Sequence, residues 1–363
     1  MMLLFLAALL AQPLPAPAQA PAAVSAEAKT WPVREGEVVL KDFRFRSGEA
    51  HPRLRIHYRT LGRPSRNSAG EIDNAVMLLH GTGGSGAQFL RPQFADELFG
   101  PGQPLDITRY WIILPDNIGH GQSSKPSDGM RMAFPKYDYD DMVEAQRRLL
   151  VEGLGVNQLR LILGTSMGCM HAFVWGETHP GFAKSLMPLA CQPIEIAGLN
   201  RMWRQLLIDG IKADPAWNHG KYGAQPAQGL RTAQSLLLVV GGAPLHLQEQ
   251  YPTRDKAATF VRESVASALP RLDANDMIYQ FESSRNYNPW PKLEAIEAPV
   301  MWVNSADDFI NPRNLAVPEA AMKRMKAARF RLIQESQSTR GHGTHTWAAF
   351  WKADLSELLE RSN

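Results

Sequence analysis

The stretch LILGTSMGCMHAF, residues 161–173, limits what this chain can fold into more than any other segment. A run of aliphatic residues ends at Gly164, Ser166 follows two positions later, and Gly168 follows two positions after that. The pattern G-x-S-x-G between a strand and a helix predicts a sharp turn that exposes the serine side chain above a sheet. The glycines allow the two backbones to approach without Cβ clashes. A plain strand-to-helix turn is the alternative, and the flanking segments favour the nucleophile interpretation.

Apolar runs elsewhere predict a mostly parallel central sheet. Near-continuous runs, typical of strands that helices cover on both faces, span residues 75–80, 110–116, 159–164, 185–190, 300–305 and 330–336. Two earlier segments with alternating polarity, 38–45 and 54–62, are typical of an antiparallel start. Helical patterns at 139–155, 170–180 and 345–362 separate the runs. This alternation predicts an α/β fold with helices flanking the sheet.

A helical cap is expected to interrupt this sheet domain. Helical patterns without intervening strands follow one another at 201–217, 234–251, 256–269 and 273–284. We therefore divide the chain into a signal peptide and leader (1–26), a first core part (27–194), a cap (195–295) and a second core part (296–363).

The first 26 residues differ from the rest of the chain. Their apolar stretch, residues 1–10, is shorter than the about 20 residues that a membrane-spanning helix needs, and it suits a signal peptide. Small-x-small sites at 18–20 and 24–26 would allow cleavage, although no Lys or Arg precedes the apolar stretch. We expect export to the periplasm or secretion. The alternative is an uncleaved segment that anchors the protein to a membrane.

Charge and cysteine content exclude some classes of function. The formal net charge is only +3 over 363 residues, and no basic run is present, so no nucleic-acid partner is expected. Cys169 and Cys191 are the two cysteines, too few for a disulfide framework. We expect two buried free thiols, while an oxidising compartment would allow one bridge.

A serine hydroxyl becomes a useful nucleophile only when a base removes its proton. In this type of fold an acid and a histidine follow the serine in that order. The acid is expected after the strand at 300–305, at Asp307 or Asp308. Asp308 is preferred because Pro312 follows four residues later, the usual spacing for this loop.

The histidine is expected in the segment RGHGTHT, residues 340–346. His342, flanked by glycines, is preferred over His345, which is expected to begin the following helix. His342 would act as general base and then as general acid, and the carboxylate would hold its tautomer. The pair at i and i+3 has no suitable third ligand nearby, so we expect no metal, and the chemistry implies no cofactor.

Two backbone N–H groups are expected to form an oxyanion hole, those of Met167 and Thr82. Thr82 lies in HGTGGSG, residues 80–86, which lacks the G-K-[ST] of a phosphate-binding loop. Arg201 and Arg204, at the start of the cap, are candidates for binding a substrate carboxylate, although helical arginines are commonly solvated surface residues. His120 is expected to be structural.

These residues also resemble the homoserine O-acetyltransferase-like branch of the α/β-hydrolases, over about residues 40 to 355. The similar segments include NAVMLLHGTGGS, FPKYDYDDMVEAQRRLL, LILGTSMGCMHAFVWGETHP, NSADDFINP and RGHGTHT. The resemblance implies the α/β-hydrolase fold and a catalytic set of Ser166, Asp308 and His342. True acetyltransferases of the family usually carry His-Ala-Leu-Thr-Gly where this chain has HGTGG, and DNIGHGQSS (116–124) is closer to simple esterases.

Hydrolases and acyltransferases of this type share the first step, in which the serine forms an acyl-enzyme. Export would separate the protein from acetyl-CoA, so we predict an exported serine hydrolase, esterase-like, with a Ser-His-Asp catalytic triad. The alternative is an O-acyltransferase that moves an acyl group from a thioester to an alcohol. A non-catalytic binding protein is disfavoured because all three residue types occur in order. The expected partner is a small-molecule ester or acyl substrate, and the resemblance also favours a homodimer, because family members often pair through their caps.

Overall fold

The computed structural model describes residues 29–362, and the compact folded unit begins at Trp31. The signal peptide and leader predicted over residues 1–26 lie outside the described residues. Within the described part of the chain, no helix combines the length and the apolar character needed to cross a bilayer.

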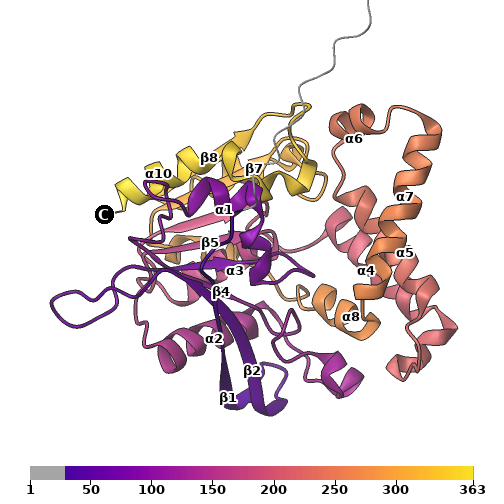
Figure 1. Cartoon of the computed structure of the whole chain (residues 1–363), viewed down its shortest axis with the longest axis horizontal. Coiled ribbons are helices and arrows are strands. Elements are labelled where there is room, and N and C mark those ends of the chain that lie inside the picture. The colour runs from indigo at the N-terminus through magenta and orange to yellow at the C-terminus, as the bar shows by residue number, and fades with distance from the viewer. Residues whose placement is uncertain (1–28, 363) are drawn as a thin grey trace, which may run out of the picture. The chain divides into compact units, whose positions relative to one another are not determined.

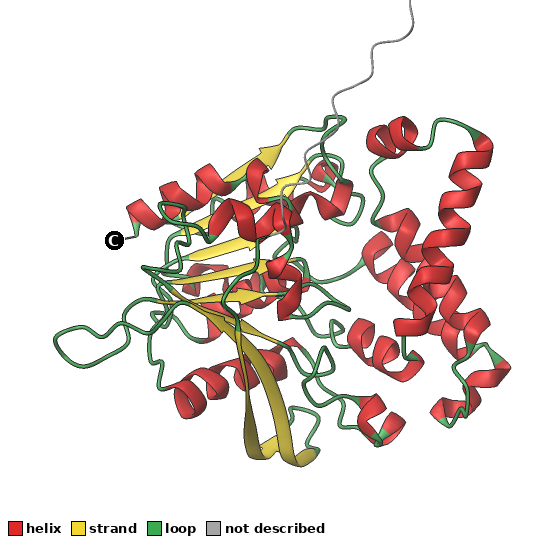
Figure 2. Cartoon of the chain, in the orientation of Figure 1, coloured by secondary structure: helices red, strands yellow, loops and turns green. Residues whose placement is uncertain are grey.

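A twisted sheet of eight strands forms the centre of the unit, in the order β1-β2-β4-β3-β5-β6-β7-β8 (Figure 2). The strands are β1 (Arg34–Arg44), β2 (Ala50–Leu61), β3 (Ala75–Leu79), β4 (Trp111–Pro115), β5 (Leu161–Thr165), β6 (Leu186–Leu189), β7 (Val300–Ser305) and β8 (Ala328–Ile333). Strand β2 pairs antiparallel with β1 and β4, and the remaining pairs are parallel. The predicted α/β-hydrolase fold, with an antiparallel start and a mostly parallel sheet, is confirmed.

Helices cover both faces of the sheet because successive strand residues point to opposite sides. In β3, Val76 and Leu78 belong to one hydrophobic core, whereas Met77 and Leu79 belong to the other. Helices α1 (Pro92–Leu98) and α10 (Lys352–Arg361) pack on the first side, and α2 (Tyr139–Arg148) and α3 (Met167–Thr178) pack on the second (Figure 1). Helix α1 was not predicted from the sequence. A further short helix, α9 (Val317–Ala321), lies between β7 and β8.

Five α-helices lie between β6 and β7 without a strand among them: α4 (Gly198–Lys212), α5 (Ala227–Val240), α6 (Pro244–Gln250), α7 (Arg254–Ala268) and α8 (Ala274–Glu282). They appear in pink to orange in Figure 1. The single helix predicted over 234–251 is two helices, because the chain breaks at Gly241 and Gly242. The proposed domain boundaries stay predictions.

Helix α8 connects this helical segment to the sheet domain through hydrogen bonds. Ser127 donates from its N–H and its hydroxyl to the two carboxylate oxygens of Asp276, at 2.8 and 2.6 Å. The Gln280 side chain donates to the Gly119 carbonyl at 2.8 Å. These contacts place α8 over the loops that follow the carboxyl ends of the strands, where ligands bind in open α/β sheets.

Candidate active site

Ser166 stands on a strained turn between β5 and α3. Its backbone angles are φ 55° and ψ −110°, in a region that residues with a side chain rarely adopt. A Cβ on Gly164 would lie 1.9 Å from the Gly168 carbonyl oxygen, and a Cβ on Gly168 would lie 2.0 Å from the Leu79 carbonyl oxygen. No larger residue fits at either position, which explains why G-x-S-x-G is needed here. Strain of this kind persists where surrounding structure enforces it.

The structure brings Ser166, His342 and Asp308 into one hydrogen-bonded row. The distance from Ser166 Oγ to His342 Nε2 is 2.8 Å, and from His342 Nδ1 to Asp308 Oδ2 it is also 2.8 Å. Because an ionised carboxylate only accepts hydrogen bonds, Nδ1 carries the hydrogen, and Nε2 is free to accept from the serine hydroxyl. The three preferred residues therefore meet, although 176 positions separate the serine from the histidine.

Asp308 is buried but stays the acceptor of this row. Burial alone would raise the pKa of Asp308, but the charge and hydrogen bond of His342, with further donors, hold that pKa below its ordinary value. The further donors are the Asn311 side chain at 2.8 Å and the Ile310 N–H at 2.9 Å. Asn311, whose role was not predicted from the sequence, also donates to the Ala190 carbonyl at 3.0 Å. The carboxylate is thus ionised and fixed in position.

Asp307, the alternative acid, points to a different partner. Its carboxylate accepts from the Thr339 hydroxyl at 2.7 Å, from the Gly341 N–H at 3.0 Å and from the Ser305 hydroxyl. Thr339 and Gly341 belong to the loop that carries His342. The two neighbouring acids therefore have different tasks: Asp308 orients the imidazole ring, and Asp307 holds the loop.

His345, the alternative base, makes no hydrogen bond to Ser166 within the described residues. Its Nδ1 contacts the His342 carbonyl instead, and burial lowers the pKa of His345 to about 3. The expectation that His345 begins the last helix is wrong, because α10 begins at Lys352. His342 and His345 both lie in one short 3-10 segment, Gly341–Thr346.

The predicted oxyanion donors lie on the two segments that flank the serine. Met167 is the first residue of α3, so its N–H has no acceptor within the helix. The loop after β3 lies against Ser166, since a Cβ on Gly81 would be 3.3 Å from the serine Cβ. Thr82 follows directly. The Gly168 N–H donates to the His80 carbonyl at 3.1 Å, which joins this loop to the start of α3.

A buried polar network, also missed from the sequence, supports the same loop. Asn117 donates from its N–H to His80 Nε2 at 3.1 Å, and Gln146 contacts both Asn117 and His171. The Trp175 indole N–H also belongs to this network and donates to the Gln146 side-chain oxygen at 2.7 Å. In the sequence nothing distinguishes these residues from other helix and loop residues. They come together only because α2 packs against α3.

A cavity of about 590 Å³ opens over the serine and the histidine. Its walls come from α3, from the segment after β6, from α4 and from the loop after β7. The large apolar side chains among them are Met170, Ile194, Ile196, Leu199, Phe309, Ile310 and Leu315. A larger cavity of about 940 Å³ is lined by Thr82 on the core side and by α5 and α8, and neither Ser166 nor His342 lines it. The smaller cavity is the site where the row of side chains can act.

Of the two candidate arginines, only Arg204 lines this cavity. Arg204 is 3% exposed and donates to the Asn200 side chain at 2.9 Å. Burial lowers its pKa, and no carboxylate pairs with it within residues 29–362. Arg201 instead lies 3.4 Å from Glu282 and donates to Gln205. Arg204 also donates to the Ser284 hydroxyl at 3.4 Å, and its guanidinium carbon lies 4.6 Å from the centre of the Trp203 ring. These neighbours are neutral, so they leave the charge of the buried guanidinium uncompensated.

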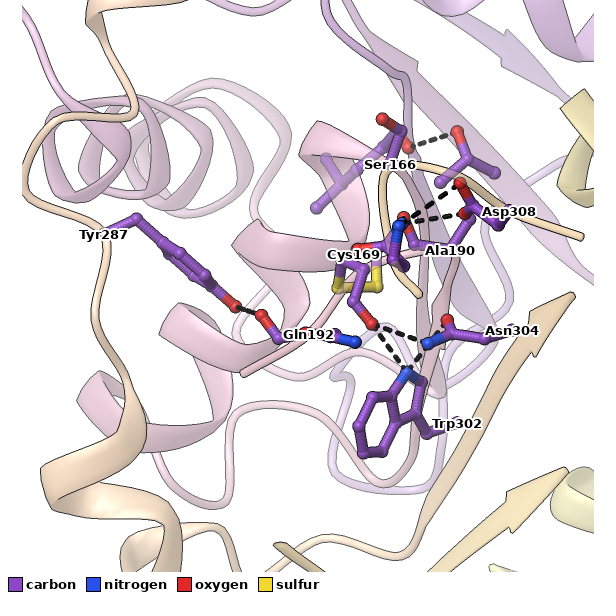
Figure 3. Close-up of a disulfide and its surroundings, with 12 residues drawn as sticks. Ser166, Cys169, Ala190, Gln192, Tyr287, Trp302, Asn304 and Asp308 are labelled. Carbon is purple, nitrogen blue, oxygen red and sulfur yellow. Dashed lines mark hydrogen bonds between the residues drawn. A yellow bond between two sulfur atoms is a disulfide. The ribbon is translucent and has the colours of Figure 1, made fainter. Parts of the chain in front are cut away.

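The two cysteines form a disulfide, which corrects the expectation of free thiols. Their Cα atoms are 5.8 Å apart. Figure 3 shows the bond between the two sulfur atoms. Cys169 lies on the first turn of α3, and Cys191 follows β6, the parallel neighbour of β5. Helix α3 connects these two strands and packs over them, so the cysteine side chains face each other across the crossover.

Residues 74–337 match the family model described as alpha/beta hydrolase fold. The chain belongs to the α/β-hydrolase family. It is 29% identical over 286 residues to a probable acyltransferase of Methanothermobacter thermautotrophicus, covering 78% of this chain and 86% of that protein. It is 30% identical over 274 residues to a homoserine O-acetyltransferase of Solidesulfovibrio magneticus, covering 67% and 68%.

Among solved structures, an acetylester hydrolase from Corynebacterium glutamicum is similar in fold. It has a TM-score of 0.77 and 20% sequence identity, and the match covers 90% of this chain and 96% of that one. The chain is thus a homoserine O-acetyltransferase-like α/β-hydrolase, an enzyme of a family whose members include both acyltransferases and esterases.

Proposed function

We propose that this enzyme is an exported serine hydrolase that cleaves small or medium acyl esters through an acyl-enzyme. The observation that carries the proposal is the row from Ser166 through His342 to Asp308, of which Ser166 and His342 line a mainly apolar cavity. The cavity suits an acyl chain, because apolar walls favour the burial of hydrocarbon.

In the proposed reaction each of these residues has a separate role. His342 Nε2 takes the hydroxyl proton as Ser166 Oγ attacks the ester carbonyl, and Asp308 stabilises the resulting imidazolium. The N–H groups of Met167 and Thr82 would receive the oxyanion. His342 then donates its proton to the leaving alcohol. Water, activated by the same histidine, attacks the acyl-enzyme and releases the acid.

Export is supported by the disulfide. Structural disulfides persist in oxidising compartments and are rare in the cytosol, where thiols are kept reduced. The Cys169–Cys191 bridge is therefore consistent with a periplasmic or secreted enzyme. Cell fractionation tests this point: recovery of the mature protein in the cytoplasm with two free thiols would contradict it.

Chromogenic acetate and butyrate esters test the reaction itself. The purified enzyme should release the chromophore, and a fluorophosphonate should label Ser166. Ser166→Ala should lose turnover by about five to six orders of magnitude and lose labelling. Turnover that persists in Ser166→Ala, or an unlabelled wild type, would refute the proposal.

Acyl transfer is the second candidate, because Arg204 could bind the carboxylate of an amino-acid acceptor. A planar guanidinium recognises a carboxylate with two parallel hydrogen bonds. With acetyl-CoA as donor, a transferase would release free CoA only when homoserine is present. Equal release with and without homoserine would favour hydrolysis.

A homodimer through the cap is also part of the proposal. Three apolar residues of α4 are exposed at i, i+3 and i+7 on one helical face: Leu199, Met202 and Leu206. An apolar stripe of this kind is typical of an interface. Light scattering should give twice the chain mass, and Met202→Glu with Leu206→Glu should give the single-chain mass. A wild-type monomer would contradict this part.

A further inference from the structure

The disulfide joins the two segments on which the hydrogen-bonded row depends. Cys169 lies three residues after Ser166, and Cys191 lies two residues beyond the end of β6. Thr165 and Leu189 are already matched across β5 and β6, so the bridge is not needed to hold the strands together. It restrains the segments just beyond the strand ends, where the site is built.

One of these segments contains a strained residue, Ala190, with φ 64°. A conformation of this kind persists only where neighbouring contacts enforce it. The Ala190 carbonyl accepts a hydrogen bond from the Asn311 side chain at 3.0 Å, and the same amide group donates to Asp308 at 2.8 Å. The position of Ala190 therefore sets one of the partners that fix the acid.

The adjacent residue, Cys191, is tied to the strand that leads to Asp308. Its carbonyl accepts from Trp302 Nε1 at 2.9 Å and from the Asn304 side chain at 3.1 Å, both on β7. Figure 3 shows the two donors converging on this carbonyl beside the disulfide. Cys191 also lines the cavity over the serine. One covalent bond and two hydrogen bonds thus connect the nucleophile helix with the acid strand.

We propose that the Cys169–Cys191 disulfide is a positioning cross-link for the reaction. It holds the first turn of α3, and with it Ser166, at a fixed place relative to Asp308 and His342, so turnover depends on the oxidised state. The inference rests on the proposed ester hydrolysis. Reduction by dithiothreitol would break the S–S bond: two electrons and two protons pass to the sulfurs, two thiols form, and the dithiol closes to its cyclic disulfide.

The test compares three full-length proteins: oxidised wild type, a Cys169→Ala/Cys191→Ala double variant, and Leu54→Ala. Leu54 is fully buried on β2, away from the cavity, so its truncation lowers the melting temperature without touching the site. The readouts are kcat and KM for a chromogenic ester, the rate of fluorophosphonate labelling, and the melting temperature.

We expect kcat and the labelling rate of the double variant to fall by about 10- to 100-fold, as for a small misplacement of reacting groups. KM should change by less than about two-fold, because ground-state contacts are kept. Leu54→Ala should keep its kcat and its labelling rate despite a lower melting temperature. A double variant with wild-type kcat and labelling rate would overturn the inference, whatever its melting temperature.

If the double variant does not fold, reduced wild type gives the same measurement. Mass spectrometry after alkylation confirms two free thiols, and reoxidation by oxidised glutathione should restore kcat. Full turnover by the reduced protein would overturn the inference. Absence of ester turnover by the oxidised wild type would instead refute the proposed function, and the labelling rates would still decide whether the bridge positions Ser166.

Discussion

Replacing Asp308 by Asn should abolish most of the activity while leaving the fold intact. The carboxylate accepts hydrogen bonds from His342 Nδ1 at 2.8 Å, from the Asn311 side chain at 2.8 Å and from the Ile310 N–H at 2.9 Å. An asparagine has nearly the same shape, but only its carbonyl oxygen can accept. The backbone N–H groups of Ile310 and Asn311 both donate to Oδ1, so the asparagine oxygen will take that position. The amide NH₂ will then occupy the position of Oδ2, facing the imidazole.

An NH₂ group facing Nδ1 forces the ring into the other tautomer, with the hydrogen on Nε2. That nitrogen then cannot take the proton of Ser166. In a triad, the loss of the correct tautomer costs about 10⁴-fold in kcat. At 1.36 kcal/mol for each tenfold change, this equals about 5 kcal/mol of activation free energy. The assay is ester turnover by wild type and Asp308→Asn at neutral pH, together with the melting temperature.

Asp307→Asn is the matched control, because the substitution is identical and the site is one residue away. It weakens the contacts to Thr339 and Gly341, which position the histidine loop. We expect a loss of about 10-fold in kcat, from a loosened loop with the ring tautomer intact. An Asp308→Asn enzyme within tenfold of wild type, or an Asp307→Asn enzyme that is the weaker of the two, would refute the assignment.

Gly164, Arg204 and His120 each allow a separate test. Gly164→Ala should lower the free energy of unfolding by about 3 kcal/mol, because the added Cβ would clash with the Gly168 carbonyl. The control Gly223→Ala adds a Cβ in open space and should change that free energy by less than about 0.5 kcal/mol. A urea titration measures both. Arg204→Met should raise the free energy of unfolding by about 1–2 kcal/mol, because it removes a buried charge that no carboxylate neutralises. The same variant should have a raised KM only for substrates that carry a carboxylate. A lower stability together with an unchanged KM would contradict this prediction. Burial lowers the pKa of His120 to about 3, so the stability that its neutral ring contributes is complete above about pH 6.5 and is lost as the pH falls toward 3. Between pH 7 and pH 5 the wild type should therefore lose about 2 kcal/mol more than His120→Asn, and equal losses would show that the ring titrates normally.

Much of the fold could be predicted because parallel strands have a recognisable pattern in the sequence. Each parallel strand is buried on both faces, so it appears as a continuous apolar run between polar segments. The run at 300–305 coincides with β7, and that at 75–80 extends β3 by one residue. Helix α1 escaped notice because its seven residues are too few to show a helical period. The break at Gly241 and Gly242 shows the same limit, since the apolar pattern continues across it.

The meeting of Ser166, Asp308 and His342 could be predicted for a related reason. Parallel strands end at one edge of the sheet, so residues just after β5, β7 and β8 gather there whatever their separation in sequence. The residues that hold them could not be predicted in the same way. Gln146 lies in the middle of α2, and nothing in the spacing of helical residues shows that its partners are Asn117 and His171.

The cysteine pair shows how an argument from composition fails where one from topology succeeds. Two cysteines among 363 residues suggested packing rather than bonding. However, Cys169 is one helical turn past the serine, and Cys191 is two residues past a strand end that is matched with Thr165 across β5 and β6. Once β6 is known to be the neighbour of β5, the crossover helix must bring the two side chains together. The missing information was therefore the strand order, which a sequence read segment by segment does not contain, and the same order explains why the bridge lies beneath the serine and not elsewhere in the core.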